Sequence, residues 1–335
     1  MVSLAAKTAS IALVVAALTA GTAAPRGTSI CATIPLRAKP RTMLLSGHTL
    51  WVALRGAHAA KPGRLLRLDA RSGRVLASFP LPFDPLRIAA GFGSLWLTGQ
   101  GGERRYGGVL RLDPRSGHVL AVIRRRTGLG TALATTAHAV WVGGPDRYPP
   151  HHPERAGVYF VYKLDPRTNS VVRRFRLRST VIDLAGAGSS LWITGWYAVA
   201  RLSESGRVLL RQPIKGSAWS IARAADGVWA AHTFYGTRRI RGTPPPAREL
   251  FRIRETQPRL TVVDLDESPW EVSSAGGVVW VALGEYSHQV ERFRDGRPPT
   301  ALAPVAIPGV VHGLQAGRQG VWVAQLMPNA LIRVC

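Results

Sequence analysis

Five polar residues stand at fixed distances from a repeated tryptophan, and their types could support acid–base or metal chemistry. Arg87, Asp183 and Glu271 each lie nine residues before a tryptophan. His312 lies ten residues before another tryptophan, and His232 lies three residues after one. Two carboxylates together with imidazoles could hold a divalent ion or transfer protons. The alternative is a solvated polar channel in which opposite charges neutralise one another.

These distances are meaningful because the tryptophan belongs to a strand-like motif that occurs seven times. In each copy an aliphatic residue precedes the tryptophan and a small or aliphatic residue follows it, and the copies centre on Trp51, Trp96, Trp141, Trp192, Trp229, Trp280 and Trp322. Successive copies are 45, 45, 51, 37, 51 and 42 residues apart. Repeats of about 40–50 residues built from strands are typical of propeller blades. The sequence therefore predicts an all-β, seven-bladed β-propeller of four-stranded antiparallel blades.

The second copy shows the expected order of strands within a blade. An inner strand, the tryptophan strand, a third strand and an outer strand are predicted at residues 86–90, 95–98, 109–112 and 119–123. The turn at 113–117 has Asp, Pro and Gly where a tight turn needs them, and it recurs at 69–73 and 165–169. Equal offsets from the tryptophan then place Arg87, Asp183 and Glu271 in one ring around the central channel.

The tryptophans themselves separate into two groups. The seven repeated ones are expected to pack between blades, because they share one register on an apolar strand. Trp196, Trp219 and Trp270 fall outside that register, and the last two stand directly before the predicted channel ring. All three are therefore candidates for lining a binding surface, and Trp219 and Trp270 are candidates at the channel mouth.

The pattern resembles the secreted bacterial propellers of the YVTN-repeat and virginiamycin B lyase-like group. Repeats in that group pair an aliphatic–Trp strand with a Leu-Asp-Pro-x-Ser/Thr-Gly turn, as Leu112 to Gly117 do here, and the resemblance covers residues 31–335. It implies the propeller fold, whereas the group mixes enzymes with proteins of no assigned reaction. Its lyases are expected to use a metal-assisted His and Glu at the channel mouth, with the acid in a Trp-Phe-Thr-Glu pattern. In that slot this chain has His232 once and Leu, Gly or Gln in the other copies.

Two cysteines, Cys31 and Cys335, bracket the predicted propeller. Residues 330–335 match a third strand with no fourth strand after it, and residues 31–36 match the end of a fourth strand at 77–81. The N-terminal strand is therefore expected to complete the last blade and close the ring. A disulfide between Cys31 and Cys335 should join the two strands, with Cα atoms about 4.4–6.8 Å apart.

Composition and the N-terminus predict an exported, basic protein. Residues 1–24 have a Lys, an uncharged apolar stretch and small residues at their end, as a signal peptide does, and residues 25–335 then form a single domain that is secreted or extracytoplasmic. The apolar stretch is too short for a comfortable membrane span. The chain has 44 Lys and Arg against 19 Asp and Glu; five of the 44 are Lys, which leaves 39 Arg. This excess of Arg over Lys and of basic over acidic residues is explained by the codon usage of a GC-rich genome, or by binding to an anionic partner such as a cell-wall polymer or polysaccharide.

The predicted loops between second and third strands vary most in length and mark one rim as the functional face. They span 55–63, 99–107, 143–157 and 232–249. The loop at 143–157 contains His151 and His152. The two side chains would point apart in an extended loop, so no metal site is expected there. The sequence contains no glycine-rich phosphate-binding loop, no calcium-binding loop of alternating Asp and Asn, and no Gly-x-Ser-x-Gly nucleophile elbow.

Two functions remain open at this point. The first is a monomeric extracellular binding or scaffold propeller that presents its loop-rich rim to a polymer, a small ligand or a protein, with no specific nucleic acid as partner. The second is a virginiamycin B lyase-like lyase or hydrolase acting at the channel mouth. No cofactor is predicted, and a divalent metal at the channel mouth is the open alternative.

Overall fold

A computed structural model of the chain describes residues 29–56, 62–100, 108–124, 130, 132–145, 158–233, 247–256, 259–284, 286–318 and 320–335. The predicted signal peptide at 1–24 lies outside these residues, as do His151, His152 and most of the predicted inserts. The regular elements of the described part are all β-strands. It contains no helix with the length and apolar character needed to cross a membrane.

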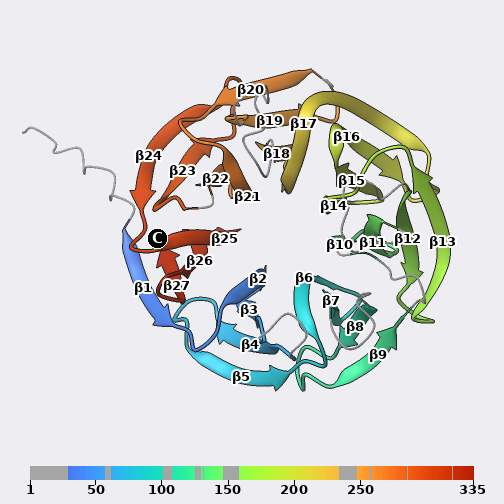
Figure 1. Cartoon of the computed structure of the whole chain (residues 1–335), viewed down its shortest axis with the longest axis horizontal. Coiled ribbons are helices and arrows are strands. Elements are labelled where there is room, and N and C mark those ends of the chain that lie inside the picture. Colours follow the sequence, from blue (N-terminus) through green and yellow to red (C-terminus); the bar gives the residue numbers. More distant parts are fainter. Residues whose placement is uncertain are drawn as a thin grey trace, which may run out of the picture.

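The strands form antiparallel sheets around a common centre (Figure 1). Each repeated tryptophan lies on the second strand from the centre, as predicted, and we name each set of inner, second, third and outer strands a unit after its tryptophan. The inner strands are β2 (Pro40–Ser46), β6 (Asp84–Gly91), β10 (Ala132–Thr135), β14 (Asp183–Ala187), β17 (Val208–Ala224), β21 (Pro269–Ala275) and β25 (Val310–Gly317). The second strands are β3 (Thr49–Leu54), β7 (Ser94–Gln100), β11 (Val140–Pro145), β15 (Ser190–Thr194), β18 (Gly227–Thr233), β22 (Val278–Leu283) and β26 (Gly320–Leu326).

The third and outer strands complete the units toward the periphery. The third strands are β4 (Arg64–Asp69), β8 (Gly108–Leu112), β12 (Tyr159–Asp165), β16 (Trp196–Ser203), β19 (Glu249–Arg254), β23 (Gln289–Arg294) and β27 (Ala330–Val334). The outer strands are β5 (Val75–Pro80), β9 (Val119–Ile123), β13 (Ser170–Leu177), the first half of β17, β20 (Leu260–Asp264), β24 (Thr300–Ala306) and β1 (Ile30–Pro35).

The sheet count differs from the expectation of separate four-stranded blades. Among the described residues five sheets have four strands each, and a sixth runs through seven strands from β14 to β20. The cause is β17, a continuous strand of 17 residues. Its first half pairs with β16, and its second half, from Ser217 onward, pairs with β18. One strand thus serves as the outer strand of the Trp192 unit and the inner strand of the Trp229 unit.

The hydrophobic core lies between neighbouring units. Each repeated tryptophan is at most 5 % exposed and packs toward the next unit, while the aliphatic residues beside it pack toward the preceding one. Trp51, for example, shares a cluster with Leu95 and Leu97, whereas Leu50 and Val52 share a cluster with Trp322. The interpretation of these tryptophans as inter-unit packing is therefore confirmed.

The predicted Asp-containing turns join third and outer strands. In the Trp96 unit Asp113 Oδ1 accepts the N–H groups of Arg115 (2.7 Å) and Ser116 (2.8 Å). Gly117 follows with φ +71°, and a Cβ there would meet the ring of Phe79 in the preceding unit. Glycine is required at this turn both by its backbone angle and by the close approach.

The N-terminal strand lies beside the last strand of the chain. β1 pairs antiparallel with β27, and a disulfide joins Cys31 to Cys335 with Cα atoms 6.0 Å apart. This distance falls in the range expected from the strand pattern. Ile34 contacts the turn at Gly73 of the Trp51 unit, as Phe79 contacts Gly117.

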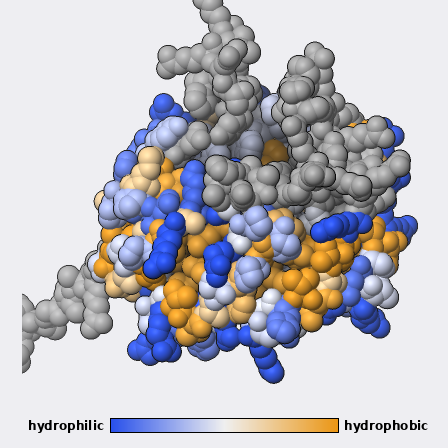
Figure 2. Space-filling model, turned by 60° about the horizontal axis from the view of Figure 1, so that its bottom comes forward, coloured by the Kyte–Doolittle hydropathy of each residue, from blue (hydrophilic) through white to orange (hydrophobic). Residues whose placement is uncertain are grey.

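The outer strands carry apolar and charged side chains side by side. Figure 2 shows the two kinds interleaved on the face in view. Val119 and Leu120 of β9 are 47 % and 50 % exposed, whereas β13 exposes Arg173, Arg174 and Arg176. Charges on such outer strands disfavour edge-to-edge pairing with another sheet.

Candidate functional site

The residues nine before each tryptophan occupy one level of the inner strands. Arg87 pairs with Thr98, Asp183 with Thr194 and Glu271 with Ala282, and each partner lies two residues after its tryptophan. Because the register is the same, the three side chains stand at the same end of the sheets. This end is where the connections from second to third strands begin.

A β-bulge directly before this level was not foreseen from the sequence. In five units the pairing between inner and second strand skips one residue, and the skipped residues are Arg41, Leu86, Trp219, Trp270 and His312. A bulge re-aims side chains next to it, and bulges are over-represented near functional sites. A signal was available: Pro40, Pro85 and Pro269 directly precede three of the skipped residues. Proline cannot donate to the ladder and is confined to strand starts, edges and bulges.

The charged side chains of the ring contact one another and the neighbouring inner strand. Arg87 Nε lies 3.6 Å from Asp183 Oδ1. Asp183 also accepts the N–H of Leu184 (3.0 Å) and that of Ile221 on the next inner strand (3.3 Å). The acids therefore hold adjacent units together as well as facing the cation.

Two further residues at the ring level repeat this link between inner strands. The N–H of Val272 donates to Ser220 Oγ (3.2 Å), and the N–H of Leu314 donates to the Glu271 carboxylate. Three consecutive units thus each offer an oxygen to the backbone of the next inner strand. If the ring is only a solvated polar channel, the acids still have a structural role, because they link neighbouring inner strands through backbone hydrogen bonds.

Burial raises the pKa values of the acids at this level of the inner strands and lowers that of the histidine. It raises the pKa of Glu271 to about 7, with Asp183 adding to the rise and Arg87 opposing it. Burial also raises the pKa of Asp183, again against Arg87. Burial together with the charges of Arg41, Lys39 and Arg87 lowers the pKa of His312 to about 4. At neutral pH His312 is therefore uncharged, and Glu271 is partly protonated.

Arg41 adds a cation to the same mouth. Burial and the nearby charge of Arg87 lower its pKa, and Asp84 opposes them. Its Nε is buried and has no hydrogen-bond partner among the described residues. A buried donor of this kind is costly unless a ligand or water accepts from it.

The two non-repeated tryptophans lie beside each other at this level. The rings of Trp219 and Trp270 are stacked, with centroids 5.9 Å apart and planes 12° from parallel. Both side chains are half-buried. The bulges of β17 and β21 produce this stack, because each tryptophan is the skipped residue of its strand.

His232 departs from the predicted ring. Its ring is buried against Phe251 (centroids 4.5 Å apart), Nδ1 lies 2.8 Å from Glu249, and Nε2 contacts the Lys215 carbonyl oxygen. The physical reason is its position on β18, where alternation turns the side chain into the packing between strands and not toward the centre. The structure thus brings Arg87, Asp183, Glu271 and His312 together and leaves His232 apart.

The described residues contain no group of three or more His, Cys, Asp or Glu side chains placed to hold a metal ion. Arg87 lies 3.6 Å from Asp183, and its charge also lowers the pKa of Glu271 against the larger effect of burial. Arg41 and Arg87 thus lie close to the two acids and on the same level as the stacked tryptophans.

Comparison with known proteins gives matches among solved structures. No protein-family model matches the chain, and no curated protein matches its sequence. Virginiamycin B lyase from Staphylococcus aureus matches with a TM-score of 0.67 at 14 % identity, covering 90 % of this chain and 98 % of the lyase. BamB from Moraxella catarrhalis matches with a TM-score of 0.57 at 12 % identity, covering 91 % and 99 %. The chain has a β-propeller fold.

The propeller fold agrees with the resemblance stated from the repeats. The Neurospora crassa Pan2 WD40 domain also matches, with a TM-score of 0.65 at 13 % identity and 89 % coverage of both chains. Identities this low establish the shared fold, and the ligand or reaction of each neighbour stays with that neighbour. What this propeller binds must therefore be argued from its own channel mouth.

Proposed function

We propose that the protein is a secreted binding propeller of seven four-stranded blades that holds an anionic cell-wall polymer at its channel mouth. Residues 1–24 would be removed as a signal peptide, and residues 25–335 would form one domain. The observation that carries the proposal is the mouth itself, where Arg41 and Arg87 lie on the same level as the Trp219–Trp270 stack.

Contacts between the first and last units support a closed ring of seven blades. Trp322 packs with Met43 and Leu50 in one cluster, just as Trp51 packs with the unit after it. Trp322 Nε1 donates to the Ala70 carbonyl oxygen at 3.2 Å, and β2 contacts β25. The division of β17 between two units supports the count of seven, because its halves fill two strand positions.

The charge and chemistry of the mouth support an anionic ligand. Burial, together with the charges of Arg41, Lys39 and Arg87, lowers the pKa of His312 and keeps its imidazole neutral, and three cations thus act on one side chain of the mouth. The acids of the ring are occupied by backbone N–H groups, and Asp183 is only 14 % exposed. A flat apolar pair beside donors is the usual lining of a small-molecule or polymer site. The disulfide between Cys31 and Cys335 is compatible with an extracytoplasmic location.

Co-sedimentation with bacterial cell-wall sacculi tests the proposal. Sacculi are used before and after extraction of their anionic polymers, with the exported protein at low and at moderate salt. We expect binding to untreated sacculi, loss of binding after extraction, and about tenfold weaker binding for Arg41→Gln and Trp270→Ala.

The matched control is Arg115→Gln, which removes one exposed turn arginine far from the mouth. Binding that falls equally in Arg41→Gln and Arg115→Gln would indicate general attraction by net charge and contradict a site. Binding that survives extraction of the anionic polymers would contradict the ligand class.

A lyase or hydrolase reaction at the channel mouth is the second candidate, and Glu271 is the observation that favours it. A buried carboxyl with a pKa of about 7 is suited to proton transfer near neutral pH. The imidazole of His232 gives the reaction no support, because both ring nitrogens already have partners. One solved virginiamycin B lyase structure contains quinupristin, which makes that compound the natural probe. Under the binding proposal its chromatographic retention and absorbance spectrum stay unchanged on incubation with the protein, because mass alone would miss a ring opening by elimination, which adds and removes no atoms. A new product peak that Glu271→Gln abolishes would establish the enzyme instead.

A further inference from the structure

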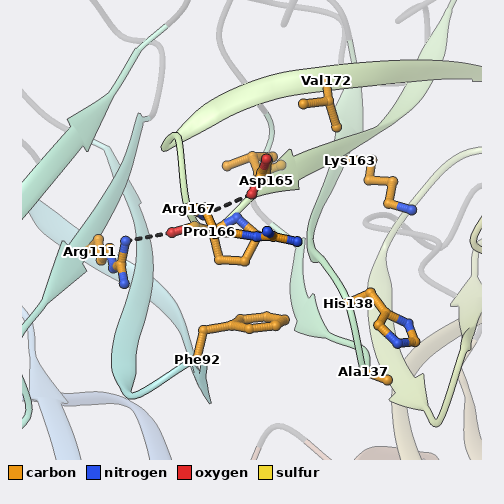
Figure 3. Close-up of a pocket in the computed structure, with 10 residues that line it drawn as sticks. Phe92, Arg111, Ala137, His138, Lys163, Asp165, Pro166, Arg167 and Val172 are labelled. Atoms are coloured by element: carbon orange, nitrogen blue, oxygen red, sulfur yellow. Dashed lines mark hydrogen bonds between the residues drawn. The ribbon is translucent and has the colours of Figure 1, made fainter.

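A separate pocket lies at the opposite end of the propeller from the channel mouth. It opens between the Trp96 and Trp141 units, where the turn after β6 and the turn after β12 approach each other (Figure 3). Its volume is about 750 Å³. A pocket of this size can take a ligand as large as one or two sugar rings.

Two of its cations are held in place by the propeller framework. The guanidinium of Arg111 lies over Trp96, 5.2 Å from the ring centroid, and donates to Ser94 Oγ (2.9 Å) and to Asn169 Oδ1 (3.0 Å). The ammonium of Lys163 lies 5.5 Å from the centroid of Trp141 and 3.5 Å from Glu204. Both groups are therefore positioned before any ligand arrives, which lowers the entropic cost of binding.

A third cation at the opening is available for a ligand. Arg167 is exposed, and its guanidinium has no ion-pair partner among the described residues. The nearest acid in the lining, Asp165, uses Oδ1 to accept the Arg167 N–H at 2.8 Å within its own turn. Glu204 neutralises Lys163, 3.5 Å away, and its carboxylate also lies 3.2 Å from His138 Nδ1. Arg111 and Arg167 therefore leave the pocket with an excess of positive charge.

Apolar faces complete the lining. Phe92 has a φ of +56°, an unusual angle for a bulky residue, between Gly91 and Gly93. Figure 3 shows its ring facing Pro166 and Arg167 across the opening, with His138 at the side. A ligand between these faces would contact a ring and a proline while its charged group meets the arginines.

We propose that this pocket binds an acidic sugar residue, with its carboxylate on Arg167 and Arg111 and one ring face on Phe92. Planar guanidinium groups match a carboxylate with two donors, and cations outnumber free acids in the lining. The site is independent of the channel mouth, because the two lie at opposite ends of the inner strands.

Titration with D-glucuronate tests the proposal, with D-glucose as the neutral comparison and heat or NMR shifts as the readout. We expect binding of glucuronate, none of glucose, and about tenfold weaker binding for Arg167→Ala. Arg115→Ala is the matched control, because Arg115 holds the same position in the equivalent turn of the Trp96 unit and does not line the pocket. We expect it to bind as the wild type does.

A second pair of variants tests the pocket without removing an arginine. Val172→Asp places an acid in the lining, and Leu120→Asp places one at the equivalent position of β9. Only Val172→Asp should weaken glucuronate binding. Equal losses in Arg167→Ala and Arg115→Ala would overturn the site, as would loss in Arg41→Gln with Arg167→Ala unaffected, which would move the sugar to the channel mouth. Absence of glucuronate binding would overturn it too.

Discussion

At the scale of single residues, Glu271 and His312 make the channel mouth respond to pH in opposite senses. The pKa of Glu271 is about 7 against an ordinary value of 4.5, so the folded protein keeps a proton that the unfolded chain loses in this window. The pKa of His312 is about 4 against an ordinary 6.5, so here the unfolded chain binds the extra proton. The contribution of Glu271 to the free energy of unfolding is fully present below pH 4.5 and is lost as the pH rises through 7. The contribution of His312 is fully present above pH 6.5 and is lost as the pH falls toward 4.

Glu271→Gln should therefore change the pH dependence of the free energy of unfolding. The wild type loses stability between pH 4.5 and 7 relative to the variant, by at most about 3 kcal/mol, because only the wild type must release this buried proton. Urea denaturation at pH 4.5, 6 and 8 gives the difference directly. Gln can still accept the Leu314 N–H, so the fold is retained.

His312→Asn provides the opposite sign as a control. Relative to this variant, the wild type should gain stability as pH rises from 4 to 6.5 and show no further change above. Arg87 and Arg41 also face these groups and stay charged through this pH range, whereas the charge of Asp183 contributes to the pKa of Glu271, so the Glu271→Gln comparison reports the two carboxylates as a coupled pair. Parallel curves for wild type and both variants would show that burial at the mouth is much weaker than the structure indicates.

At the scale of elements, a basic residue on the third strand lies over the tryptophan of the second strand. This holds for Arg67, Arg111, Lys163, Arg201, Arg252 and Arg292. Several of these side chains also reach the next unit: Arg111 donates to the Pro166 carbonyl oxygen, and Arg201 pairs with Glu255 at 3.1 Å. Part of the positive charge of the chain thus has a structural role, as cation–π contact and inter-unit link.

Arg252→Met should be far more costly than Arg67→Met, although both remove a cation above a tryptophan. Arg252 is fully buried and pairs with Asp295 (3.0 Å) and Asp226, so its loss leaves the carboxylate of Asp295, which is only 13 % exposed, without its cation. We expect a loss of about 3 kcal/mol. The Nε of Arg67 has no hydrogen-bond partner in the described part of the chain, and its loss should cost under about 1 kcal/mol. Urea midpoints of the two variants, compared with the wild type, measure both; equal losses would refute a linking role for the third-strand cation.

The bulges on the inner strands show the limit of pattern reasoning at this scale. Equal spacing from the tryptophan correctly predicts that Arg87, Asp183 and Glu271 share a level, because strand pairing transmits register without error. The skipped residue before that level depends on local backbone geometry. The bulges bring Arg41, Trp219 and His312 to the channel mouth. In the sequence, only the prolines before some of the bulges indicate them.

At the scale of the whole molecule, the ends of the chain hold each other in place. β1 is the outer strand beside β27, and its Ile34 fills the space against Gly73 and Trp322 of the neighbouring strands. The disulfide closes a loop with a sequence separation of 304 residues. A cross-link across such a long loop lowers the conformational entropy of the unfolded chain, and this stabilises the folded state relative to the unfolded one.

Replacing Cys31 and Cys335 together with Ser should therefore lower the free energy of unfolding by about 5 kcal/mol, the value that the chain-entropy model gives for a loop of this length. Denaturation of the wild type under oxidising and reducing conditions should show the same difference, and the double variant should not respond to reductant. Intact mass of the exported protein checks the bond itself. Two free thiols in that protein, or equal midpoints for wild type and variant, would contradict the contribution assigned to the disulfide.

The sequence alone determined the propeller fold, the position of the tryptophan strand, the Asp-containing turns and the pairing of the N-terminal strand with the last one. These follow from a seven-fold repeated pattern, and each repeat obeys the same local rules of alternation and turn chemistry. The tertiary structure decided which side chains meet. His232 turns into the packing against Phe251, Arg87 reaches Asp183 two units away, and β17 runs through two units as one strand. Such contacts depend on distances between residues far apart in the chain, and a repeat pattern fixes register but not the reach of a side chain across the centre.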